Sequence, residues 1–262
     1  MYRPEPRQIE EQANSMDVRY GIQLLATRLG YAIERKIPSD LDAATAATIR
    51  SVAGFTMSSP AAVAALCAAV RYVVEHRVSG DLVECGVWRG GSMMAIALTL
   101  GDLDATDRTL WLYDTYAGMT SPSTVDVRDL DGATPAVGFA SGYLEGGGHR
   151  WANASLEEAQ SNMESTGYPT DRLRYVVGRV EDTIPAKAPE HVALLRLDTD
   201  FHDSTLHELE HLYPRLAKGG VLVLGDYGSW QGFRKAVDDF VADGHPMHLV
   251  RVDPTVYVSV KP

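Results

Sequence analysis

VECGVWRGGSM, residues 83–93, is an apolar run that ends in an acid and continues into three glycines, one arginine and a serine. The apolar run SMMAIALTLGDL (92–103) then predicts a helix that begins directly after the glycines. A strand, a glycine turn and a helix in this order open a βαβ unit, where doubly wound sheets bind their ligands. The spacing is E-x-G-x-x-x-G-G, and no glycine stands two residues after Gly86, as the dinucleotide fingerprint requires. The turn therefore predicts a ligand that places no phosphate against it.

The rest of the chain alternates between strand and helix patterns. Strands are predicted at 81–87, 109–116, 173–180, 191–198 and 221–228, and a closing hairpin at 247–252 and 255–260. Further helices are predicted at 155–167, 204–220 and 230–244. This alternation predicts an α/β fold with a doubly wound, Rossmann-like sheet of seven strands, in which the hairpin supplies antiparallel edge strands.

Two long regions lie outside this alternation. Apolar residues recur at helical spacing in the first 76 residues, so we expect residues 1–76 to form an N-terminal helical cap region on a core of residues 77–262. The segment 117–150 is rich in Gly, Ser, Pro and Asp and has no such periodicity. Long loops in compact domains are commonly functional, and we expect this one to be a substrate lid.

The composition bounds the possible partners. The chain has 24 Lys and Arg against 35 Asp and Glu, a formal net charge of −11, and no basic stripe, which argues against nucleic acid. It has no apolar run of about 18 residues, so no membrane partner is expected. Cys67 and Cys85 stand in apolar stretches and are expected to be buried thiols of a cytoplasmic protein. The apolar N-terminal helices predict a homo-oligomer.

Asp114 adds a second signal to the glycine turn. It ends the predicted strand TLWLYDTY, 30 residues after Glu84. A carboxylate at this place accepts hydrogen bonds from the two hydroxyls of a ribose. Each signal alone is weak, because a glycine turn is often only tight packing. Together in one βαβ unit they predict a nucleoside-type site, and the E-x-G-x-x-x-G form favours S-adenosylmethionine (SAM).

Longer motifs carry a resemblance to a family. VECGVWRGGSMMAIALTL, LYDTYAGM, LLRLDTDFHDSTLHELEHLYPRLAKGG and GDYGSWQGFRKAVDDF resemble the macrocin O-methyltransferase-like family over roughly residues 18–245. The resemblance implies a class I methyltransferase fold, SAM as methyl donor and usually magnesium. It also implies a small-molecule glycosylated acceptor, methylated on a sugar hydroxyl in antibiotic biosynthesis.

The same resemblance implies the residues that bind SAM. The glycine turn and the second strand end would hold its amino acid and ribose, a segment before the long helix would close over it, and two later segments would contact the adenine. The turn residues are Glu84, Gly86, Arg89, Gly90 and Ser92, and the residues at the second strand end are Asp114 and Thr115. The segment before the long helix supplies Thr56, Met57 and Ser58. The adenine contacts are Ser155, Glu181 and Asp182, and Asp198 would lie beside the cofactor. Ser155 could instead be a plain helix cap and Asp182 a turn residue.

Two carboxylates are predicted at neighbouring strand ends. Asp198 follows HVALLRL and Asp226 follows VLVLG, so the pair could hold one magnesium ion, which would lower the pKa of a bound sugar hydroxyl. Asp198 is the leading candidate for the general base. The family pattern Asp-Asp-Tyr reads Gly225-Asp226-Tyr227 here, so one expected ligand is missing. Water could replace it, or the chain could use no metal.

Without a metal, the base could be Asp198 alone or a histidine. His149 lies in the predicted lid and His202 follows the Asp198 strand directly. Asp200 could substitute for the missing ligand or cap a helix. Two other functions stay open: a SAM-binding protein without catalysis, which the missing ligand favours, and a nucleotide-dependent oxidoreductase, which the absent dinucleotide fingerprint disfavours.

Overall fold

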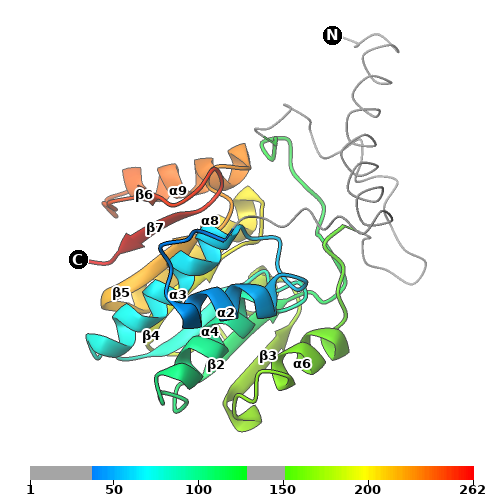
Figure 1. The fold of residues 1–262 in the computed structure, drawn as a ribbon. Coiled ribbons are helices and arrows are strands. Elements are labelled where there is room, and N and C mark those ends of the chain that lie inside the picture. The colour runs from blue at the N-terminus through cyan, green and yellow to red at the C-terminus, as the bar shows by residue number, and fades with distance from the viewer. Residues whose placement is uncertain (1–36, 129–150) are drawn as a thin grey trace, which may run out of the picture. The chain divides into compact units, whose positions relative to one another are not determined.

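The protein is described by a computed structural model that covers residues 37–128 and 151–262. Its sheet has the order β3-β2-β1-β4-β5-β7-β6 (Figure 1). The strands are β1 (Asp81–Cys85), β2 (Leu110–Asp114), β3 (Leu173–Val177), β4 (Val192–Leu197), β5 (Leu216–Leu224), β6 (Val250–Arg251) and β7 (Tyr257–Val260). The pairs among β1 to β5 are parallel, and β7 runs antiparallel to β5 and β6. The predicted seven-stranded doubly wound sheet with a closing antiparallel hairpin is confirmed.

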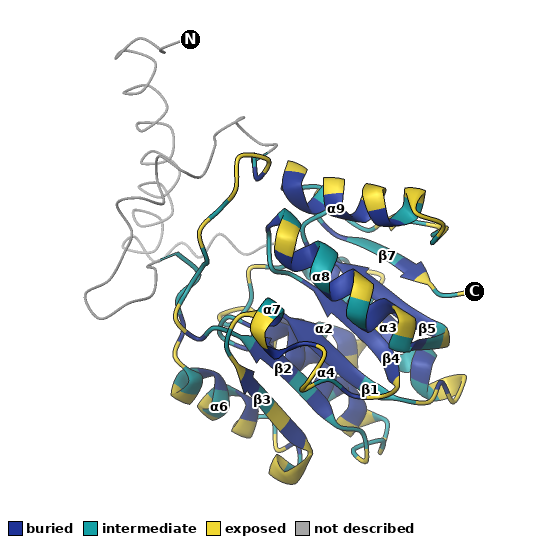
Figure 2. Ribbon diagram, turned by 180° about the vertical axis from the view of Figure 1, so that it is seen from behind, coloured by how far each residue is buried: buried dark blue, intermediate teal, exposed yellow. Residues whose placement is uncertain are grey.

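Helices cover both faces of the sheet (Figures 1 and 2). One face carries α2 (Ala43–Val52), α3 (Pro60–Glu75), α4 (Gly91–Asp102) and α6 (Leu156–Glu164). The other carries α7 (Val180–Thr183), α8 (His202–Leu212) and α9 (Gln231–Ala242). Short 3-10 turns precede β3 at Thr170–Arg172 and β5 at Tyr213–Arg215. Each face therefore has its own apolar layer, which is what a sheet buried on both sides requires.

Local sequence explains where these elements begin. All six residues of β4 are buried, as expected of a central parallel strand. The side chain of Ser59 accepts a hydrogen bond from the backbone of residue 62, and Pro60 occupies the first turn of α3. Ser155 caps α6 by accepting from the backbone N–H of Glu158. The side chain of Ser155 therefore makes a helix-cap contact, which was the alternative prediction for this residue.

The two regions outside the alternation are described only in part. Within the predicted cap region, α2 and α3 pack with α4 against the sheet. Residues 1–36 and 129–150 lie outside the described residues, so the boundary at residue 76, most of the lid and His149 stay predictions. No helix in the described ranges is long and apolar enough to cross a membrane.

Glu208 is a carboxyl enclosed between α8 and the sheet. It is fully buried, and its Oε2 accepts a hydrogen bond from the Thr199 hydroxyl at 3.3 Å. Its Oε1 has no hydrogen-bond partner among residues 37–128 and 151–262. Burial raises its pKa well above the ordinary 4.5. The folded protein therefore keeps a proton at Glu208 that the unfolded chain releases.

We predict that Glu208→Gln weakens the pH dependence of stability. The stabilising contribution of the Glu208 proton is complete below about pH 4.5 and is lost as the pH rises toward the raised folded-state pKa. The free energy of unfolding should therefore fall less with rising pH in the variant than in the wild type, as measured by denaturant titrations. Glu210→Gln, on the exposed side of the same helix, is the matched control. Parallel curves for the wild type and both variants would contradict the prediction.

Candidate active site

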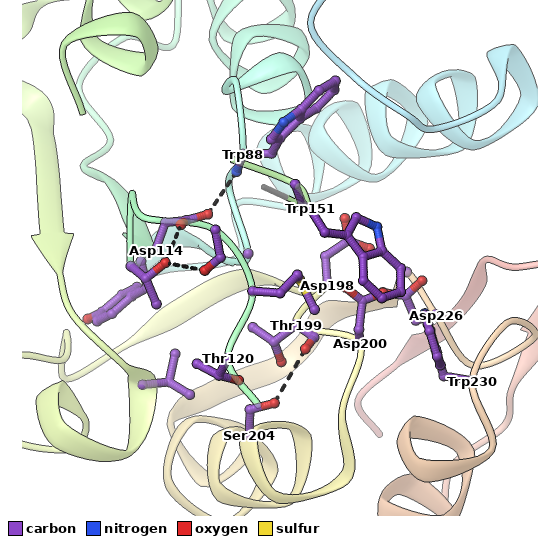
Figure 3. A pocket seen from close by; sticks show the side chains of 18 of the residues that line it. Trp88, Asp114, Thr120, Trp151, Asp198, Thr199, Asp200, Ser204, Asp226 and Trp230 are labelled. Atoms are coloured by element: carbon purple, nitrogen blue, oxygen red, sulfur yellow. Dashed lines mark hydrogen bonds between the residues drawn. The ribbon is translucent and has the colours of Figure 1, made fainter. Parts of the chain in front are cut away.

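A cavity of about 340 Å³ lies at the carboxyl ends of the parallel strands (Figure 3). Residues at or just beyond the ends of β1 to β5 line it. They are Gly86 and Trp88, Asp114 and Thr115, Gly178 to Glu181, Asp198 to Asp200, and Gly225 and Asp226. Doubly wound sheets bind ligands at this edge. The backbone of Trp88 and Asp200 is left-handed, with φ of 50° and 65°, and such conformations concentrate at functional sites.

The glycine turn is shaped by close backbone contacts. Gly86 has a φ of 85°, and a Cβ there would overlap the carbonyl oxygen of Asp198. A Cβ at Gly91 would overlap the carbonyl of Phe55, which accepts a hydrogen bond from the Gly91 amide at 3.0 Å. The two glycines therefore let the ends of β1 and β4 and the segment before α3 approach one another.

Asp114 ties the turn to the end of β2. Its Oδ2 accepts from the amides of Val87 and Trp88, and its Oδ1 from the amide of Tyr116, all at 2.8 Å. Burial raises the pKa of Asp114, although these amides act in the opposite direction. The carboxylate lines the cavity. The Thr115 hydroxyl lies 3.4 Å from Oδ1 but makes its shorter contact, at 2.7 Å, with the carbonyl of Gly118, so Oδ1 can accept one further hydrogen bond, as a ribose-binding acid needs.

A buried ion cluster stands beneath the cavity. Nη1 of Arg196 lies 2.6 Å from Oε1 of Glu84 and 2.8 Å from Oδ2 of Asp198, and its Nη2 lies 3.2 Å from the Ser58 hydroxyl. Arg196 and Glu84 are 4% and 1% exposed, whereas 28% of the Asp198 side chain is exposed. Burial raises the pKa of Glu84 to about 8, against the effect of Arg196. Asp198 is therefore the member of this cluster that reaches the cavity.

Asp226 and Asp200 form a second acidic contact at the cavity wall. Burial, together with repulsion from Asp198, raises the pKa of Asp200 to about 7. Burial, together with repulsion from Asp200 and Asp198, raises the pKa of Asp226 well above its ordinary value of 3.8.

The donor set does not fit a magnesium ion. Oδ2 of Asp198 is already paired with Nη1 of Arg196 at 2.8 Å. A Cβ at Gly225 would overlap Oδ1 of Asp198, so this carboxylate occupies the space of the missing ligand. Among residues 37–128 and 151–262, no three His, Cys, Asp or Glu side chains are grouped as metal ligands.

The structure brings together only some of the predicted site residues. Those that line the cavity are Met57, Ser58, Gly86, Asp114, Thr115, Glu181, Asp198 and Asp226. Those that do not are Thr56, Glu84, Arg89, Gly90, Ser92, Ser155, Asp182 and His202. Arg89 instead pairs with Glu158 at 2.6 Å and donates to the carbonyl of Gly54 at 2.6 Å, which joins α6 to the segment before α3.

His202 lies at the start of α8, away from the cavity. Its Nδ1 is 2.8 Å from Asp203, and its Nε2 is 3.7 Å from Asp239 of α9. Its amide donates to the buried carboxylate of Asp126 at 2.8 Å. The imidazole is therefore engaged with surface carboxylates rather than with the cavity.

An aromatic wall was missed by the sequence analysis. Trp151 and Trp230 line the cavity with their ring centroids 5.5 Å apart, and Phe201 packs edge-on against Trp230 at 5.7 Å. Figure 3 shows both tryptophans on the side of Asp200 and Asp226, with Asp114 on the opposite side. No local pattern could indicate that two tryptophans so distant in sequence meet.

Comparisons with known proteins agree with this geometry. The family model described as Macrocin-O-methyltransferase (TylF) matches residues 9–258. The 8-demethyl-8-(2,3-dimethoxy-alpha-L-rhamnosyl)-tetracenomycin-C 4'-O-methyltransferase of Streptomyces olivaceus is 34% identical over 65% of this chain and 61% of its own length. Demethyldecarbamoylnovobiocin O-methyltransferase of Streptomyces niveus is 32% identical over 66% and 62%. The chain thus spans about three fifths of the length of these curated relatives.

A solved structure supports the fold assignment. The O-methyltransferase NovP has a TM-score of 0.67 and 28% identity, over 79% of this chain and 82% of that one. The fold is that of the class I methyltransferases, as predicted.

We predict that Asp114→Asn destabilises the protein. An amide has one acceptor oxygen, so its NH₂ group must face a backbone N–H that the carboxylate now satisfies. The free energy of unfolding should fall by about 1–3 kcal/mol in denaturant titrations. Asp102→Asn, an exposed change at the end of α4, is the control. Equal stability of the two variants would refute the role of Asp114 as a clamp.

Proposed function

This chain belongs to the macrocin O-methyltransferase (TylF) family, and we propose that it transfers the methyl group of SAM to a sugar hydroxyl of a glycosylated natural product in antibiotic biosynthesis. One observation carries the proposal: a single cavity joins Asp114 at the end of β2 to the partly exposed carboxylate of Asp198 just after β4. The name of the Streptomyces olivaceus relative specifies methylation of a rhamnosyl derivative, which supports a sugar hydroxyl as the acceptor.

The residues along the cavity suit SAM. Asp114 supplies an acceptor for ribose hydroxyls, and Gly86 and Gly178, which also line the cavity, leave room for a ligand close to the backbone. Glu181 also lines the cavity and is proposed to contact the adenine. SAM would supply a methyl group on a sulfonium: the acceptor oxygen bonds to the methyl carbon as the carbon–sulfur bond breaks and its electron pair leaves with sulfur.

Asp198 is proposed as the general base. Its carboxylate is partly exposed to the cavity and would accept the proton of the acceptor hydroxyl as that oxygen is methylated. The proton then passes to solvent. Arg196 keeps the carboxylate in one orientation, which is what a reacting group needs in order to meet its partner at contact distance.

The aromatic wall of Trp151 and Trp230 is proposed to bind the acceptor. It lies beside Asp198 and opposite Asp114, so an acceptor packed on it would place its hydroxyl next to the base (Figure 3). Aromatic faces pack well on the apolar faces of sugars and on planar ring systems. Three predictions from the sequence complete the proposal. They are a substrate lid at residues 117–150, assembly as a homo-oligomer and a cytoplasmic location.

Ligand binding and transfer test this function. S-adenosylhomocysteine (SAH), the demethylated product, should raise the melting temperature, because a ligand that binds only the folded state stabilises it. With labelled SAM and a panel of glycosylated antibiotics and their aglycones, label should enter only glycosylated acceptors. Asp198→Asn should lower transfer by about a hundredfold or more, whereas Asp203→Asn, 79% exposed, should not.

Other results would indicate the alternatives. SAH binding without transfer to any acceptor would favour a non-catalytic SAM-binding protein. A shift with nicotinamide cofactors and none with SAH would favour an oxidoreductase.

A further inference from the structure

The cluster around Asp198 contains its own cation. Asp198 directly follows the central strand β4, and Arg196 is the second-last residue of that strand. One nitrogen of Arg196, Nη1, contacts both Glu84 and Asp198, at 2.6 and 2.8 Å. Burial alone would lower the pKa of Arg196, but the two carboxylates raise it above its ordinary range. The guanidinium is therefore charged at every pH at which the protein is folded.

The position of Gly225 is part of the same arrangement. A Cβ at residue 225 would overlap Oδ1 of Asp198, while Oδ2 is the atom held by Arg196. Any side chain at 225 would therefore push the carboxylate out of its present place. The absence of a side chain at 225 and the contact with Arg196 together define one orientation of Asp198.

A divalent cation would have to compete with this arrangement. Magnesium needs oxygen ligands in a nearly octahedral shell, and the oxygens of Asp198 are directed at Arg196 and over Gly225. Asp226, the other predicted ligand, belongs to no group of three His, Cys, Asp or Glu side chains that could hold a metal ion within residues 37–128 and 151–262. A metal ion at this position would also stand close to the buried guanidinium, and the two positive charges would repel one another.

We propose that Arg196, and not a divalent metal ion, is the cation that orients Asp198, and that methyl transfer by this chain requires no metal. Arg196 is a positioning residue, since it does not line the cavity and acts through Asp198. Its Nη2 lies 3.2 Å from the hydroxyl of Ser58, a cavity residue just before α3, so the guanidinium also joins Asp198 to that segment. The catalytic part of this inference rests on the proposed function; the part concerning the cation does not.

Manganese is the direct probe of the cation. Mn²⁺ takes the oxygen ligands that suit Mg²⁺, and its electron paramagnetic resonance signal reports the free ion. The wild-type protein with saturating SAH should leave the Mn²⁺ signal unchanged. Stoichiometric loss of the free signal in the wild type, abolished by Asp198→Asn, would overturn the proposal whether or not an acceptor is known.

A stability cycle tests the contact between Arg196 and Asp198 without any assay of activity. Removing Arg196 alone would leave the buried carboxyl of Glu84 without its hydrogen-bond partner and could prevent folding. The background is therefore Glu84→Gln/Arg196→Gln, which removes both charges and keeps polar side chains. Asp198→Asn should lower the melting temperature in the wild type and in Glu84→Gln, which keeps the guanidinium, and much less in the double variant. An equal effect in all three backgrounds would overturn the proposal.

Turnover tests the catalytic part. Transfer by the wild type should be the same in EDTA and in excess magnesium, and a requirement for magnesium would contradict the proposal. Glu84→Gln/Arg196→Gln should lower kcat by roughly a hundredfold, the scale expected for a misplaced reacting group, with acceptor KM and SAH affinity nearly unchanged. Arg196→Lys, which keeps the positive charge, should retain more of kcat. Arg108→Lys, whose arginine donates to the Gly80 carbonyl before β1, is the matched control.

These readouts separate the two proposals. If the protein neither binds SAH nor transfers a methyl group, the proposed function fails, while the manganese titration and the stability cycle still decide which cation holds Asp198. If SAH binds and transfer needs magnesium, the proposed function stands and the inference about Arg196 fails.

Discussion

Glu84 and Arg196 face each other across β1 and β4 in the middle of the sheet, and the rest of the site depends on this buried pair. A parallel sheet covered on both faces is otherwise apolar at this depth, and β1 and β4 are apolar around the two charges. A slip of one residue would separate the guanidinium from the carboxyl and leave each buried group without its partner, at a cost of several kcal/mol. The pair therefore specifies the register in which the ends of β1 and β4 meet.

The register in turn places the backbone around the cavity. Because Cys85 pairs with Leu197, Gly86 lies against the carbonyl of Asp198, at the edge where ligands bind. Asp114, one strand further, then holds the turn through the amides of Val87 and Trp88. The carboxylates of Asp114 and Asp198 thus have structural partners as well as positions at the cavity wall. A site built in this way is preorganised, since its acids are fixed by backbone and buried charge before any ligand arrives.

Sequence patterns were sufficient for the fold and for the edge of the sheet that carries the site. Asp114, Asp198 and Asp226 end parallel strands, and the carboxyl ends of such strands meet at one edge, so their common cavity could be predicted. Glu84 shows the limit of this rule. It comes two residues before Gly86 and resembles a strand-end acid, yet it is 1% exposed and turned to Arg196.

The partners of these acids could not be predicted because they are distant in sequence. Arg196 is 112 residues from Glu84, and an arginine inside an apolar strand gives no local sign of which carboxylate it meets. His202 had the right position beside the strand of Asp198, but the N-terminus of α8 directs its ring to Asp203 and Asp239. The direction of a side chain depends on the element that carries it, which spacing along the chain does not reveal.

Gly225 shows why the loss of a side chain has two effects at once. Compared with the Asp-Asp-Tyr pattern, the glycine removes one negative charge, which by itself would only weaken a cation site. It also opens the space into which Oδ1 of Asp198 fits, and that position brings Oδ2 within 2.8 Å of Arg196. The volume lost at residue 225 is thus used by the neighbouring acid, whose charge is balanced from beneath by the guanidinium. The absence of a side chain at residue 225 and the buried guanidinium of Arg196 thus act together to orient the carboxylate of Asp198.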